Sequence, residues 1–169
     1  MKKKLALVLE CMTQIPKLRP DNKAPSWVQQ LIDASTQVRS DYLEKEAALK
    51  TGRAQLHLSA DLGHQAAISV YPIMQSIYRN DLVASESISK LPVADRASAE
   101  TLTRLEAISK QWAELPNMPG TNKTFVAGEI DKAALDELTT ELRAKIQALS
   151  PCELQFKAQH SAFYFLEYE

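Results

Sequence analysis

Three side chains with metal-binding chemistry, His57, Asp61 and His64, recur at spacings of four and three residues. On an α-helix this spacing places them on one face, because residues three and four apart are neighbours on the helix surface. Imidazole and carboxylate groups bind transition metals, and helical bundles build metal sites from inward-facing residues. One functional hypothesis is therefore a metal- or small-ligand-binding bundle that uses these three residues. The alternative is a hydrogen-bonded pair of His57 and Asp61 on a partly exposed face, with His64 beside it.

Other catalytic chemistries lack the motifs that usually accompany them. The chain contains no Glu-x-x-His, which a di-iron bundle needs, and no Gly-x-Ser-x-Gly. Cys11 and Cys152 belong to no C-x-x-C motif or Cys/His cluster. The glycines are isolated from one another, which excludes both glycine-rich phosphate-binding motifs: Gly52, Gly63, Gly120 and Gly128. The sequence therefore assigns no catalytic residue, no metal and no cofactor, and we favour a protein that is not an enzyme over an enzymatic ligand-binding bundle.

Charge is unevenly distributed along the chain. Residues 1–25 hold six basic and two acidic residues, a net charge of +4, whereas all 169 residues together have a net charge of −1. Dedicated nucleic-acid-binding domains usually carry a clear basic excess, so we do not expect nucleic acid as a partner. A contact between the basic N-terminal segment and an anionic surface remains the least supported alternative.

The N-terminus has the first two parts of an export signal, a run of lysines and then an apolar stretch. Glu10 interrupts the apolar stretch after five residues, whereas a signal peptide needs about 7–15. No apolar run approaches the 18 or more residues of a transmembrane helix. We therefore expect a cytoplasmic protein with free thiols and no membrane contact.

Apolar residues at helical spacing predict an all-α fold with four main helices, over residues 26–50, 53–80, 95–115 and 131–149. Ser26, Asp95 and Asp131 are the expected N-caps, and Gly52 is the expected break between the first two helices. Because short connections favour antiparallel neighbours, these helices predict an up-and-down antiparallel bundle.

Prolines at positions 16, 20 and 25 bracket a polar stretch, residues 17–24, that cannot be helical throughout. We expect residues 1–25 to form a basic N-terminal element and a linker, and residues 26–169 to form a single domain. Residues 5–15 of the N-terminal element fit either a helix or a short strand, and we favour the helix.

The most regular apolar stripe belongs to the second predicted helix, and its centre consists of Ala60, Gly63 and Ala67. Small side chains at this point allow a neighbouring helix to approach closely. Close packing would offset the roughly 1 kcal/mol that a glycine costs inside a helix. We therefore expect a tight contact with a neighbouring helix at the face around Gly63.

Residues 151–169 carry two competing patterns. Leu154, Phe156 and Ala158 alternate with polar residues, as in a β-strand. Residues 150–153, Ser-Pro-Cys-Glu, instead supply an N-cap, a proline at the first helical position and a glutamate at the third. We favour a C-terminal helix from residue 151, with a short terminal β element as the alternative.

Four aromatic residues occur among the last seven residues of the chain. Either they complete the protein's own core, or they form a surface for a protein partner or a second copy, as exposed apolar patches often do. The leading functional hypothesis is a non-enzymatic protein-interaction or scaffold module that self-associates through this C-terminal aromatic segment.

Four glutamates precede a basic residue by four positions, the favourable order for an ion pair along a helix. We expect these pairs to mark solvent-facing surfaces and to imply no partner: Glu46 with Lys50, Glu100 with Arg104, Glu106 with Lys110, and Glu141 with Lys145.

Overall fold

The computed structural model describes the backbone of residues 2–15 and 24–168, and the side chains of residues 3–15 and 24–164. This part of the chain is helical and contains no strand, only an isolated bridge between Ala127 and Ile130. The all-α class is therefore confirmed. The linker expected over residues 17–24 lies outside the described residues, apart from Ala24.

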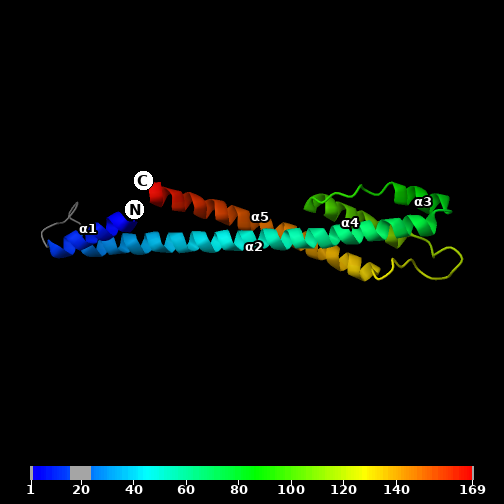
Figure 1. Ribbon diagram of the computed structural model, residues 1–169, viewed down its shortest axis with the longest axis horizontal. Helices are drawn as coiled ribbons and strands as arrows, with labels where there is room; N and C mark the ends of the chain where they lie inside the picture. The colour runs from blue at the N-terminus through cyan, green and yellow to red at the C-terminus, as the bar shows by residue number, and fades with distance from the viewer. Residues whose placement is uncertain (1, 16–23, 169) are drawn as a thin grey trace. The chain divides into compact units, whose positions relative to one another are not determined.

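The described residues form five helices (Figure 1), which are α1 (Lys2–Gln14), α2 (Pro25–Tyr78), α3 (Leu82–Ser89), α4 (Ser98–Glu114) and α5 (Lys132–Tyr168). The favoured helix near the N-terminus is confirmed by α1. At the C-terminus α5 reaches Tyr168, so the alternative of a terminal β element is wrong for the described residues.

Two predicted helix boundaries are wrong. Residues 26–50 and 53–80 belong to one helix, α2, and the helix predicted from residue 151 is a continuation of α5. Gly52 would end a helix by adopting a positive φ, but the described glycines that do so are Gly120 and Gly128. Pro151 removes one backbone hydrogen bond without ending α5. The up-and-down bundle of four separate helices is therefore not confirmed.

The chain divides into two compact units. Unit 1 comprises residues 1–51 and 151–169, and unit 2 comprises residues 52–150. The boundaries fall at Gly52 and Pro151, the two positions where the sequence favours an interruption. Both helices nevertheless run through these positions without a break.

Unit 2 contains the hydrophobic core. The second half of α2 lies beside α3, α4 and the first half of α5 (Figure 1). Gly63 confirms the predicted close approach, because a Cβ atom there would lie 2.8 Å from Leu105 Cδ1 and 3.3 Å from Thr101 Cγ2 of α4. The apolar stripe of α2 thus packs directly on α4.

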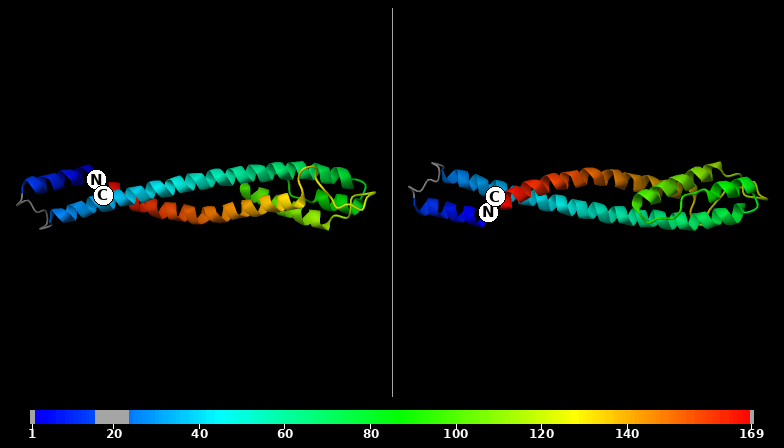
Figure 2. Two further views of the ribbon diagram at one scale, coloured as in Figure 1. Left: turned by 90° about the horizontal axis from the view of Figure 1, so that it is seen from below. Right: turned by 90° about the horizontal axis from the view of Figure 1, so that it is seen from above.

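An aromatic cluster fixes the loop between α4 and α5. The Trp112 and Phe125 rings meet edge to face at 4.6 Å, and the Trp112 indole N–H donates to the Phe125 carbonyl at 3.2 Å. The buried Tyr78 hydroxyl donates to the Pro116 carbonyl at 2.7 Å. Figure 2 shows this loop at the same end of unit 2 as the start of α3, and Pro116, Asn117 and Pro119 line an open groove with residues 80–83.

The expected helix caps have mixed outcomes. Asp131 is confirmed as a cap, because its carboxylate accepts a hydrogen bond from the Ala134 N–H at 2.7 Å. Asp95 is not the N-cap of α4. The helix begins later, after Ala97, and the Asp95 carboxylate accepts from the Ala97 N–H at 2.8 Å within the preceding turn. Ser26 lies inside α2, which begins at Pro25.

Unit 1 consists of α1, the first half of α2 and the last half of α5, and it buries few apolar side chains. Among its described residues the buried apolar ones are Met12, Val28 and Leu49. On α2 and α5, the Tyr42 ring stacks on Phe163 at a centroid distance of 4.7 Å. The other side chains of the C-terminal aromatic segment, from residue 165 onward, lie outside the described residues.

Candidate functional site

The structure does not bring His57, Asp61 and His64 together as a metal site. All three lie on α2, where His57 and Asp61 are exposed and His64 is half-buried. The His64 Nδ1 atom lies 2.9 Å from the Asp95 carbonyl oxygen, so this imidazole donates to the segment that precedes α4. Within the described part of the chain, no group of three or more His, Cys, Asp or Glu residues is placed to hold a metal ion.

The physical reason is that His57 and Asp61 face solvent beside the buried stripe of α2, whereas His64 is occupied by the Asp95 carbonyl. Ala60, Gly63 and Ala67 of that stripe are buried, whereas no second helix supplies ligands opposite His57 and Asp61 within the described residues. A single helix face provides too few ligands for a closed metal site.

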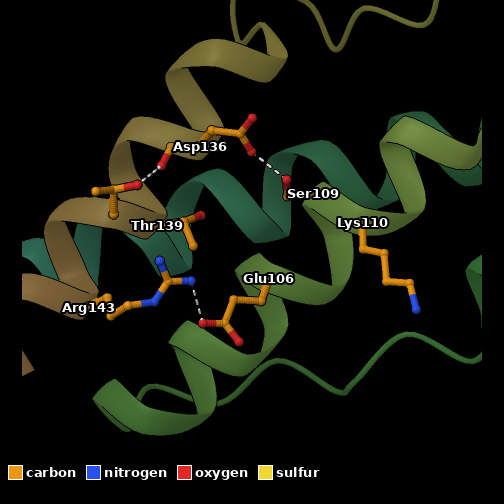
Figure 3. A pocket seen from close by; sticks show the side chains of 7 residues that line it. Glu106, Ser109, Lys110, Asp136, Thr139 and Arg143 are labelled. Atoms are coloured by element: carbon orange, nitrogen blue, oxygen red, sulfur yellow. Dashed lines mark hydrogen bonds and ion pairs between the residues drawn. The ribbon is translucent and has the colours of Figure 1, made fainter.

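A polar groove between α4 and α5 in unit 2 brings ionisable and hydroxyl side chains of the two helices together (Figure 3). Its volume is about 410 Å³, and its walls carry hydroxyl, carboxylate and cationic groups. The lining residues are Glu106, Ser109 and Lys110 from α4, and Asp136, Thr139, Thr140 and Arg143 from α5.

One side of the groove is a three-residue network around Asp136. The Lys132 ammonium lies 2.6 Å from Asp136 Oδ2, and the Ser109 hydroxyl donates to Asp136 Oδ1. The hydrogen bond from Lys132, followed by that from Ser109, lowers the pKa of the Asp136 carboxyl below its usual value. The carboxylate is therefore held ionised.

This network does not resemble the machinery that activates a serine nucleophile. A serine nucleophile needs a neighbouring base that accepts its proton. Here the Ser109 hydroxyl donates to Asp136, and the lowered pKa of that carboxyl makes it a weak base, while Lys132 Nζ donates to Ser109 Oγ at 3.3 Å. Ser109 thus links two opposite charges.

The opposite side of the groove is held by an ion pair between helices. Arg143 of α5 lies 2.8 Å from the Glu106 carboxylate of α4, and both side chains are nearly half exposed. Thr139, between the two networks, is buried and donates to the Leu135 carbonyl at 2.7 Å. The polar groups of the groove are therefore largely satisfied by one another.

Sequence reasoning missed this groove because its bonds join residues far apart in the chain. Glu106 was expected to pair with Lys110 along α4, but it pairs with Arg143, 37 positions away. Ser109 and Asp136 lie 27 positions apart and belong to no short motif. The one sequence feature that could have identified Ser109 and Asp136 is their position beside the apolar stripe of their helices.

The two cysteines are free thiols, and both are half-buried. Cys11 lies on α1 and Cys152 on α5. No helix in the described part of the chain is both long and apolar enough to cross a membrane. The chain matches no protein-family model, and neither the curated proteins nor the solved structures include a significant match.

Proposed function

We propose that the chain is a non-enzymatic interaction module that self-associates through the helices of unit 1. The observation that carries this proposal is the contrast between the two units. Unit 2 buries fifteen apolar side chains in one cluster, whereas the described part of unit 1 buries three. Helices obtain most of their stability in proteins from packing an apolar face, and the helices of unit 1 bury little apolar surface between them.

Large apolar side chains remain exposed on each helix of unit 1. Leu7 of α1 is 65% exposed, Leu43 of α2 is 52% exposed, and Leu154 of α5 is 65% exposed. At the C-terminal aromatic segment, Tyr164 is 50% exposed. A second copy that covers these side chains would provide the core that unit 1 lacks.

The charge of unit 1 favours a second copy over a strongly charged partner. Its sequence contains ten basic and nine acidic residues, a net charge of +1. Two copies therefore repel each other little. A nucleic acid or an anionic membrane would instead select a large basic excess.

The free thiols support the cytoplasm as the compartment in which the protein works. Disulfides persist in oxidising compartments and are rare in the cytoplasm. Cys11 and Cys152 are unpaired, as a reducing environment would leave them.

Sedimentation equilibrium of the full chain tests this proposal. We expect the mass of the wild-type protein to rise with concentration, and Leu154→Ser to raise the dissociation constant at least tenfold. The reason is that burying one leucine is worth about 1.5–3 kcal/mol, and about 1.4 kcal/mol corresponds to a tenfold change.

Leu82→Ser is the matched control, because Leu82 of α3 is 85% exposed but belongs to unit 2. This variant is expected to associate like the wild type. A wild-type protein that stays monomeric at every concentration would contradict the proposal, as would equal effects of the two substitutions.

A further inference from the structure

Arg104 of α4 is a buried cation without an anionic partner among the described residues. Its side chain lies in unit 2 with 5% of the residue exposed. Its Nε atom is buried and has no hydrogen-bond partner in the part of the chain that the structure describes. Glu100, the ion-pair partner expected one turn earlier, forms no ion pair with it in the described part of the chain. Other cations of unit 2, such as Lys132 and Arg143, are paired with carboxylates.

The side chain next to this guanidinium is Tyr71 of α2. The guanidinium carbon lies 5.3 Å from the centroid of the Tyr71 ring, within cation–π range. The Tyr71 hydroxyl accepts a hydrogen bond from the Gln75 side-chain amide at 2.7 Å, which holds the ring in place. The ring therefore covers one face of the guanidinium, whereas the buried Nε–H has no acceptor among the described residues.

An aromatic face cannot replace the acceptors that a guanidinium requires. The group carries five N–H donors in a planar fork, and this fork matches the oxygens of a carboxylate or a phosphate. Burial lowers the pKa of Arg104, although arginine keeps its charge in proteins. A buried charge that lacks a counter-charge is costly, and a bound ion is one way in which such a group is satisfied.

We propose that Arg104, oriented by Tyr71, anchors a binding site for an oxyanion group, either a carboxylate or a phosphate. The site lies wholly in unit 2 and does not depend on self-association through unit 1. The oxyanion would accept hydrogen bonds from the N–H edge of the guanidinium, while Tyr71 keeps contact with its face. This assigns a ligand chemistry to a residue that sequence reasoning placed in a solvent-exposed ion pair.

The direct test is an NMR titration that follows the arginine Nε–H resonances of the wild-type protein. Sodium phosphate and sodium acetate are added in separate experiments, and sodium chloride at matched ionic strength corrects for salt screening. We expect a saturable shift of the Arg104 resonance with at least one of the two oxyanions and not with chloride. The better ligand of the two decides between a phosphate and a carboxylate site.

Arg143 is the matched control, because its guanidinium is paired with Glu106 on the surface. Arg104→Lys and Arg143→Lys assign the two resonances by removing them. Tyr71→Leu removes the aromatic face and should weaken the saturable shift several-fold. The proposal is overturned if no oxyanion gives a saturable shift at Arg104, or if Arg143 shifts in the same saturable way.

A thermal melt gives a second measurement. Phosphate or acetate should raise the midpoint of the wild-type protein and leave that of Arg104→Met unchanged, because a ligand stabilises the state that binds it. If Arg104→Met does not fold, the wild-type titration alone decides. An equal rise in both proteins would contradict a site at Arg104.

Discussion

The charge of the α4–α5 groove depends on pH through the carboxyl group of Asp136. Asp136 accepts hydrogen bonds from Lys132 and Ser109, and these bonds lower the pKa of its carboxyl. A carboxyl with a lowered pKa in the folded state contributes stability above its unfolded pKa of about 3.9. That contribution is lost as the pH falls through the lower, folded pKa.

Asp136→Asn should therefore reduce the free energy of unfolding at pH 7 by about 0.5–1 kcal/mol, since the ion pair is largely solvent-exposed. The difference from the wild type should shrink below about pH 4. Urea unfolding at pH 7 and pH 2.5 measures it. Glu137→Gln, at the exposed next position, is the control and should show no such dependence. A constant difference at both pH values would refute the role given to Asp136.

At the residue scale, the sequence predicts which residues share a helix face better than it predicts which side chains contact one another. The spacing of His57, Asp61 and His64 correctly predicts that they share one side of a helix, because helical geometry depends on nearby residues alone. Whether that side meets ligands from another helix depends on packing between distant segments. For the same reason, the pairing of Arg143 with Glu106 and the burial of Arg104 could not be predicted.

At the scale of the helices, Gly52 and Gly63 lie in the same helix but have different surroundings. A Cβ atom at Gly63 would lie 2.8 Å from the buried Leu105 side chain, whereas one at Gly52 would lie 3.4 Å from Leu149 Cδ1. Overpacking costs about 1–3 kcal/mol, and replacing a helical glycine with alanine gains about 1 kcal/mol.

Gly63→Ala should consequently destabilise the protein by about 1 kcal/mol, and Gly52→Ala should stabilise it by about 0.5–1 kcal/mol. Chemical denaturation of both variants measures whether the two changes in stability have opposite signs. If both alanine substitutions are stabilising, α2 and α4 do not approach as closely at Gly63 as the structure indicates.

Local signals also misplaced the ends of two helices. Gly52 and residues 150–153 are good termination and start signals in isolation, yet α2 and α5 pass through them. Flanking residues with high helix propensity and the packing of Gly52 near Leu149 outweigh the local cost. The all-helical class and the cap at Asp131 were predictable, since they depend on periodicity and on neighbouring residues.

At the scale of the whole molecule, the apolar side chains are divided unequally between the units. Fifteen buried apolar side chains belong to unit 2, around residues such as Ile108 and Leu142. The apolar positions of unit 1 were equally evident in the sequence. Their helical spacing could not show that Leu43 and Leu154 would remain exposed. That outcome depends on whether a further helix covers them, which in our proposal is supplied by a second copy.

Hydrogen–deuterium exchange at several protein concentrations tests this claim most directly, because it reports protection for each unit separately. If a second copy completes unit 1, the amides of residues 25–51 and 151–164 should lose protection on dilution, whereas those of residues 52–150 keep it. Protection of residues 25–51 that is unchanged between the highest and lowest concentrations would contradict self-association through unit 1.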